Sequence, residues 1–252
     1  MKKTLFALLL LFNISFGYSQ TLDKKYLPVV NAFIATVKSG SIEKLSAKIK
    51  YPLTRTYPIP PIKNKQEFIK RYKEVFDDQL IKKIINSKPT TNWSDVGWRG
   101  IMLLNGNLWL DTDGKIIAVN QQSKLEAKEQ TKLINADKNK LYSSLANFTQ
   151  PVLVLETAQY RIRIDDLGNN NYRYASWSLK SNMSEKPSLV LTKGRLTADG
   201  SGGNHNYQFK SGQYTYTCYI TVLGEEDSPP AQLTITKSGK EILSLEAKRL
   251  TL

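Results

Sequence analysis

The sequence predicts an α+β protein in which N-terminal helices pack on a curved antiparallel sheet and a C-terminal all-β antiparallel barrel or sandwich follows. Three observations support this fold class: apolar residues at helical spacing in the first hundred residues, two hairpin dipeptides near residue 110, and regular short strands after residue 148. The predicted organisation is a signal peptide at 1–19, an α+β cone-like domain at 20–122, a connecting helix at 123–147 and an all-β domain at 148–252.

The first 19 residues have the three zones of a cleavable signal peptide. Lys2 and Lys3 precede an apolar run from Leu5 to Phe16, and the small residues Gly17 and Ser19 follow. Because the run is about a dozen residues long, it is shorter than the roughly 20 residues that span a bilayer as a helix. We therefore expect cleavage after Ser19 and a soluble mature protein that is periplasmic or secreted, without a lipid anchor or a membrane span.

Helical spacing recurs four times in the first domain. Apolar residues three and four apart predict helices over 22–38, 41–49, 64–76 and 78–85. Asn64 and Glu67 have the spacing of a capping box at the start of the third helix. Residues 51–62 contain four prolines, which exclude a central strand there and indicate an extended segment.

The spacing of apolar residues changes from helical to alternating after Trp93, where short strands are predicted over 97–104, 108–110 and 115–119. Asn105-Gly106 and Asp113-Gly114 separate these strands, and both dipeptides are typical of tight hairpins. The first domain should therefore end in a three-stranded meander.

Residues 123–145 predict one long polar helix with an apolar stripe that includes Leu125, Leu133 and Leu141. Beyond it, turn residues separate eight predicted strands, at 152–156, 160–165, 172–179, 188–192, 207–209, 214–223, 232–237 and 241–248. Regular short strands at this spacing indicate a closed antiparallel sandwich or barrel.

The formal net charge of +14 is concentrated in the first half of the chain. Residues 20–123 contain 17 Lys and Arg against 9 Asp and Glu, whereas residues 148–252 contain 12 against 10. Two interpretations stay open: a solvated basic face that aids solubility, or a surface for an anionic partner. Nucleic acid is not expected as a partner, because no recognition motif accompanies the charge.

The most conspicuous local pattern is the glycine-rich stretch 199–207 around His205, the sole histidine. Glycines permit close approach by a partner, so a loop at the tip of the barrel could present Ser201, Asn204, His205 and Tyr207 to it. A wide loop without a ligand is the alternative. One histidine and one cysteine supply no metal-ligand set, and we expect no cofactor and no catalytic residue there.

Two further patterns have competing structural and functional interpretations. Strand alternation places Arg161, Arg163 and Asp165 on one face, as solvated charges, as an interior polar network or as a rim that pairs with an acidic partner. Cys218 lies in an alternating strand and should be a buried structural thiol, which leaves no intrachain disulfide.

Aromatic residues of the first domain either fill its core or line a ligand pocket. Under the pocket interpretation, Tyr51, Trp98 and Trp109 supply apolar walls, and Asp111 supplies the polar group.

Two family resemblances accompany these patterns. The order helix, helix, Tyr-Pro segment, helices and meander ending in Asn105-Gly-Asn-Leu-Trp-Leu-Asp-Thr-Asp-Gly-Lys resembles the nuclear transport factor two-like, or SnoaL-like, cone fold over residues 22–120. Residues 20–123 have no histidine to match the His-Asp pairs of that superfamily's enzymes, so the resemblance implies a binding or accessory role. The stretch Ser201-Gly-Gly-Asn-His-Asn-Tyr207 is similar to the loop of periplasmic inhibitors of lysozyme, which are small barrels, although their usual cysteine pair is missing.

From these patterns we expect an exported, non-catalytic binding or accessory protein of the bacterial envelope. Its partner would be an unknown protein or small-molecule ligand. Two alternatives stay open: an inhibitor of a cell-wall hydrolase of the lysozyme type, and a small-molecule enzyme that uses an aromatic-lined pocket in the first domain.

Overall fold

The computed structural model describes residues 21–200 and 202–250, so the predicted signal peptide lies outside the described residues. The described residues divide into two units that interleave in sequence, the first formed by residues 21–50 and 78–120 and the second by residues 51–77, 121–200 and 202–250. The α+β fold class with a C-terminal barrel is confirmed, whereas the domain limits expected from the sequence stay a prediction.

The first unit combines short helices with a four-stranded antiparallel sheet. Its helical elements are the 3-10 turn η1 (Lys24–Tyr26), α1 (Leu27–Lys38), α2 (Ile42–Ser46), α4 (Asp78–Ile85) and α5 (Pro89–Asn92). Its strands follow the sheet order β1 (Trp93–Asp95), β2 (Ile101–Leu103), β3 (Leu108–Leu110) and β4 (Ile116–Val119). Trp93 is 1% exposed and meets Phe33 of α1 edge to face at 5.9 Å, so this tryptophan fills the core between helices and sheet.

The expected three-stranded meander is confirmed as β2, β3 and β4, and β1 adds a fourth strand before it that was not predicted. The predicted strand over 97–104 begins with a 3-10 turn, η2 (Gly97–Arg99), and within this range only Ile101–Leu103, which is β2, forms a strand. Gly97 and Gly100 take φ of +60° and +99°, and the carboxylate of Asp95 accepts a bond from the Gly97 amide at 3.0 Å. These positive φ angles close a tight turn between β1 and β2.

The second unit begins with the proline-rich segment 51–62, which forms a single isolated bridge between Leu53 and Ile62. Helix α3 (Lys65–Val75) follows, and Asn64 caps it as predicted, although Glu67 bonds the residue before the cap and not the cap itself. The Asn64 side chain accepts from the Glu67 amide at 3.0 Å, and the Glu67 carboxylate accepts from the Lys63 amide at 2.8 Å.

Helix α6 (Lys124–Lys138) is shorter than expected and buries a polar face. Leu125 is 56% exposed, whereas Glu126, Gln130 and Asp137 are buried. The helix ends before the 3-10 turn η3 (Ser143–Leu145). The apolar residues after it, including Leu145 and Phe148, instead pack on the outer barrel residues Ala175 and Trp177.

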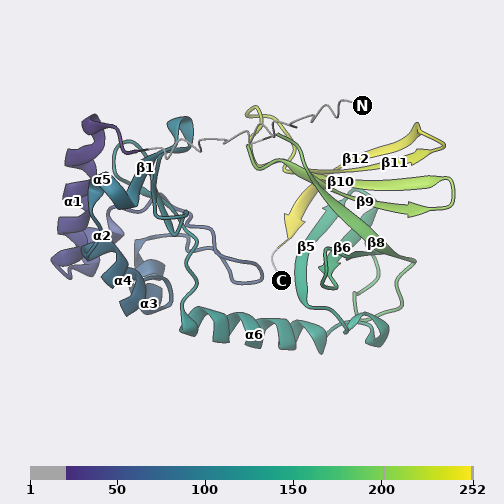
Figure 1. Cartoon of the computed structure of the whole chain (residues 1–252). Coiled ribbons are helices and arrows are strands. Elements are labelled where there is room, and N and C mark those ends of the chain that lie inside the picture. Colours follow the sequence, from purple (N-terminus) through teal and green to yellow (C-terminus); the bar gives the residue numbers. More distant parts are fainter. Residues whose placement is uncertain (1–20, 201, 251–252) are drawn as a thin grey trace, which may run out of the picture. The chain divides into compact units, whose positions relative to one another are not determined.

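Eight antiparallel strands form a closed barrel in which each strand pairs with its neighbours in the sequence (Figure 1). They are β5 (Gln150–Thr157), β6 (Tyr160–Asp166), β7 (Tyr172–Ser178), β8 (Leu189–Ala198), β9 (His205–Ser211), β10 (Tyr214–Ile220), β11 (Ala231–Lys237) and β12 (Lys240–Leu250). Four residue pairs between β12 and β5 close the ring, from Ala247 with Thr157 to Leu250 with Val154.

Side chains fill the barrel interior. The buried cluster contains Ile162, Tyr174, Phe209, Cys218 and Leu233, all 2% exposed or less. Gly194 of β8 makes room for the Phe209 ring, because a Cβ at this position would overlap the ring. The barrel interior is therefore a packed core.

Candidate functional site

Two loops at one end of the barrel form a joined rim. One loop connects β8 to β9 and contains the glycine-rich stretch, and the other connects β10 to β11. The amide oxygen of Asn204 accepts from the backbone N–H groups of Val222 and Leu223, both at 2.8 Å, and its amide nitrogen donates to the Leu223 carbonyl at 2.7 Å. One side chain therefore fastens the two loops to each other.

The glycines of the first loop are needed for this close approach. A Cβ on Gly202 would lie 2.8 Å from a methyl carbon of Leu223, and one on Gly203 would lie 3.3 Å from the Val222 side chain. Gly203 also has a φ of +92°, which L side chains rarely adopt. The glycine-rich pattern thus has a local structural cause, because the rim packs backbone against apolar side chains.

The rim exposes apolar and acidic side chains next to each other. Val222 is 55% exposed and Leu223 is 48% exposed, although both are large hydrophobic residues. The following residues, Glu225, Glu226 and Asp227, are exposed as well. We call residues Gly202–Asn204 and Val222–Asp227 the rim platform. Exposed apolar patches bordered by polar groups are typical of protein interaction sites.

Sequence reasoning missed the apolar half of the rim platform. Residues 214–223 were expected to form one strand, but β10 ends at Ile220 and leaves Val222 and Leu223 in the loop. The sequence did contain an indication of this loop, since Val222 and Leu223 directly precede Gly224 and three acidic residues, a composition that is unusual for the end of a strand.

The predicted partner-binding residues fall in different environments. Ser201 lies outside the described residues. The Nδ1 atom of His205 lies 2.8 Å from the Gly203 carbonyl oxygen, a geometry in which Nδ1–H donates, and its ring meets Tyr207 edge to face at 5.5 Å. Tyr207 is only 6% exposed and packs against Tyr172 inside the barrel, where burial raises the pKa of its hydroxyl to about 12. Of this group, Asn204 and His205 lie at the rim.

The predicted pocket residues of the first domain have separate local roles. Trp98, on η2, is 70% exposed, and the Trp109 ring packs over the turn at Gly106. The Asp111 carboxylate accepts from the backbone N–H groups of Asp113 and Lys115, at 3.1 and 2.8 Å, and so supports a hairpin turn. Tyr51 belongs to the second unit, and burial raises its hydroxyl pKa to about 12.

A charge network lies buried against the outer face of the barrel. Arg163, on β6, is 0% exposed and bonds to both oxygens of Asp137 of α6 and to Asp165 at 2.7 Å. Asp165 also accepts from Arg173 of β7 at 2.7 Å. The sequence placed Arg163 and Asp165 on one face correctly, but the solvated-charge interpretation is wrong for these two residues, because both are fully buried. Their network lies between the outer face of the barrel and α6, whereas the neighbouring Ile162 and Ile164 face the barrel interior.

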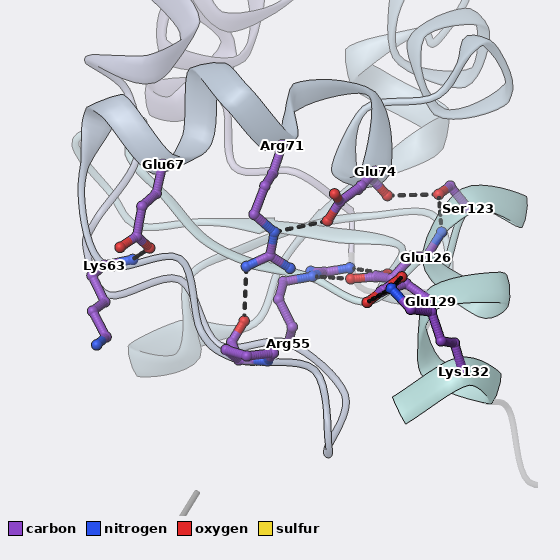
Figure 2. Close-up of polar contacts among 10 residues, drawn as sticks. Arg55, Lys63, Glu67, Arg71, Glu74, Ser123, Glu126, Glu129 and Lys132 are labelled. Atoms are coloured by element: carbon purple, nitrogen blue, oxygen red, sulfur yellow. Dashed lines mark hydrogen bonds and ion pairs between the residues drawn. The ribbon is translucent and has the colours of Figure 1, made fainter. Parts of the chain in front are cut away.

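Figure 2 shows a second buried ion pair, between the proline-rich segment and α6. The Arg55 guanidinium donates twice to the Glu126 carboxylate, at 2.6 Å for each bond, and both side chains are 2% exposed or less. Ser123 caps α6 by accepting from the Glu126 amide at 3.1 Å and also donates to the Glu74 carbonyl of α3 at 2.6 Å. These contacts hold the proline-rich segment and α3 against α6, and no local sequence pattern predicts them.

Cys218 is buried and has no disulfide partner. Burial raises the pKa of its thiol to about 12, so the thiol stays protonated at neutral pH and is a poor nucleophile. The structural-thiol interpretation is confirmed.

Within residues 21–200 and 202–250, the structure contains no helix that is both long enough and apolar enough to cross a bilayer. No protein-family model, curated protein or solved structure matches the chain. The resemblances to the SnoaL-like cone and to lysozyme inhibitors therefore stay predictions, whereas the small α+β unit and the closed eight-stranded antiparallel barrel are shown by the structure.

Proposed function

We propose that this chain is an exported, non-catalytic binding protein whose rim platform receives a protein partner. The observation that carries the proposal is the exposure of Val222 and Leu223 on loops that are already fastened to each other. A preorganised loop pair binds at a lower entropic cost than a flexible one, because less conformational freedom is lost on association.

The charge at the rim platform favours a basic partner. Glu225, Glu226 and Asp227 are consecutive and exposed, on a chain whose formal net charge is +14. In the part of the chain that the structure describes, these three carboxylates form no ion pair. Complementary charge steers association and suppresses wrong partners.

The test replaces the apolar contacts without disturbing the fold. The variant V222S/L223S removes both exposed side chains, and the matched control L125S/I242S removes two others that are 56% and 53% exposed elsewhere in the same unit. Each protein is cross-linked to an envelope extract, and the captured proteins are compared. We expect the natural chain and the control to capture the same basic protein, and V222S/L223S to lose it with an unchanged melting temperature. Equal capture by both variants would refute the assignment of the rim platform.

A second candidate function is inhibition of a basic cell-wall hydrolase of the lysozyme type, and the acidic half of the rim platform supports it. This function predicts that excess purified protein slows the clearing of cell walls by lysozyme. It also predicts that E225Q/E226Q/D227N relieves the inhibition, because the substitutions keep size and hydrogen bonding but remove charge. Undiminished clearing at excess protein would exclude this candidate and leave other basic partners.

A further inference from the structure

We propose that the outer face of β7–β9 is a binding site for an acidic polysaccharide, separate from the rim platform. Two adjoining cavities on this face carry the proposal, and both are lined by Thr192. The first has a volume of about 580 Å³ and is lined by Ser144, Leu145, Asn147, Phe148, Thr149, Leu167, Arg173, Val190 and Thr192. The second has a volume of about 330 Å³ and is lined by Thr192, Lys193, Arg195, Gln208 and Lys210. We call them the arginine cavity and the basic groove.

Strand alternation places both cavities outside the barrel. Leu191, Tyr174 and Phe209 belong to the interior cluster, so their neighbours Thr192, Arg173 and Gln208 point outward. The site is therefore independent of the packed barrel core.

Cationic side chains line both cavities. Among the described residues that line them, four are cationic and none is acidic. Lys193, Arg195 and Lys210 are exposed, and they form none of the ion pairs found among residues 21–200 and 202–250. Cations gathered in one concave groove repel one another and focus a field that attracts anions.

Arg173 is the cation among the described residues that line the arginine cavity. This side chain is 5% exposed and donates to the carbonyls of Leu145 and Asn147 and to Asp165, but its buried Nε has no acceptor. Lys138, Arg163 and Arg173 all lie within 6.0 Å of the centre of the Phe148 ring. Among the described residues, the carboxylates of Asp137 and Asp165 balance the two arginines, so the one positive charge in excess is that of Lys138.

A β-bulge sets the position of the basic groove. Tyr172 pairs with Gly194 and Tyr174 with Leu191, so Arg173 alone faces both Thr192 and Lys193. Lys193 has a φ of +61°, and its N–H donates to the Asn171 side chain at 3.0 Å. Bulges re-aim side chains beside binding sites, and this one is held by a side-chain hydrogen bond.

The remaining lining groups favour a carbohydrate. Ser144, Asn147, Thr149 and Gln208 offer neutral hydrogen bonds, and Leu145 and Val190 offer apolar surface. Sugar rings have hydroxyl edges and apolar faces, so they match this mixture. An extended chain with an anionic group on successive sugars can reach both cavities, and the first cavity lies within the usual volume range of ligand sites, roughly 300 to 1,000 Å³.

The test measures the binding of a heparin-derived oligosaccharide to the purified chain by calorimetry, with a neutral dextran oligosaccharide as the uncharged reference. The variant K193Q/R195Q/K210Q removes the charge of the basic groove. The matched control K38Q/K65Q/K240Q removes the same charge from exposed positions elsewhere. We expect the groove variant to bind heparin about tenfold more weakly, roughly twofold to threefold for each exposed ion pair, and the control to change affinity far less.

A second variant tests the arginine cavity without a change in charge. Val190 is 41% exposed, and V190W should fill the cavity and weaken heparin binding while the melting temperature stays constant. The inference is overturned if the groove variant and its control weaken binding equally, or if neither groove variant nor V190W has an effect. Binding of oligothymidylate with equal affinity and equal dependence on the groove would overturn the carbohydrate assignment. Because V222S/L223S leaves the site intact, heparin binding by that variant separates this inference from the function proposed for the rim platform.

Discussion

Replacing Arg55 with methionine should destabilise the second unit strongly. The perturbation removes the guanidinium that donates two hydrogen bonds of 2.6 Å to Glu126, whose side chain is 0% exposed. A buried carboxylate that loses its cation costs about 3–5 kcal/mol, because its desolvation is no longer offset by the pairing. Methionine keeps the apolar length of the side chain, so most of this cost is electrostatic.

The double variant R55M/E126L separates the pairing from the packing. When both charges are removed together, nothing ionised stays buried, and the stability should return to within about 1–2 kcal/mol of the natural chain. The single and double variants therefore give opposite outcomes for the same pair of positions.

Hydrogen exchange read by mass spectrometry is the suitable assay, because it reports each segment separately. In R55M, amides of α6 and of residues 51–62 should exchange faster by roughly two to three and a half orders of magnitude, which corresponds to the lost free energy. Amides of α1, in the other unit, serve as the internal reference. A loss below about 1 kcal/mol in R55M, or a double variant as unstable as the single one, would refute the reasoning.

Two further predictions concern the barrel core. In G194A, the new methyl group overlaps the Phe209 ring, so we expect thermal unfolding to show a loss of about 1–3 kcal/mol in the free energy of unfolding. The same substitution should cost less in an F209L background, and an equal loss in both backgrounds would contradict the overlap. For Cys218, the thiol pKa of about 12 in the folded protein lies above the ordinary value of 9.0, so between these pH values the unfolded chain releases a proton that the folded chain retains. Stability should therefore fall as pH rises from about 9 to 12, by up to about 1.4 kcal/mol per pH unit from this group. In urea titrations at successive pH values, the stability of C218A should decline less steeply with pH. An equal decline in C218A and the natural chain would show that the thiol does not contribute.

The strand pattern of the second half could be predicted because each strand carries its own local signal. All eight predicted strands overlap the eight strands of the barrel, and turn residues such as Ser211-Gly212 and Ser238-Gly239 mark hairpins that the structure contains. A closed sandwich or barrel was expected, but the strand pair that closes it could not be predicted, since the pairing of Ala247 with Thr157 joins positions far apart in the chain and has no local sequence pattern.

The buried polar groups could not be predicted either, because their burial also depends on contacts between distant segments. Glu126 and Asp137 lie on a helix that looks solvated, and they are buried only because Arg55 and Arg163 arrive from distant segments. An apolar stripe marks a buried helical face only when the opposing surface is apolar. In α6 the opposing surface supplies arginines, so Leu125 faces the solvent instead.

At the candidate site, the sequence indicated the loop residues but not the contacts that they make with other segments. The sequence indicated a loop at Asn204, yet the hydrogen bonds of its side chain to Val222 and Leu223 depend on the distance between two loops. The cations of the basic groove likewise come from two strands, and their gathering requires the register of Arg195 with Gln208.

The short seam between β12 and β5 has a consequence for how the protein reaches its folded state. Seven hairpins can form as the chain becomes available, but the seam must wait for the last strand, and until then β5 and β12 both present unpaired backbone groups. An incomplete barrel thus has two unpaired edge strands, and strands from another copy of the chain can pair with them. The charges along β12, among them Lys240, Glu241, Glu246 and Lys248, oppose such pairing while the seam is open.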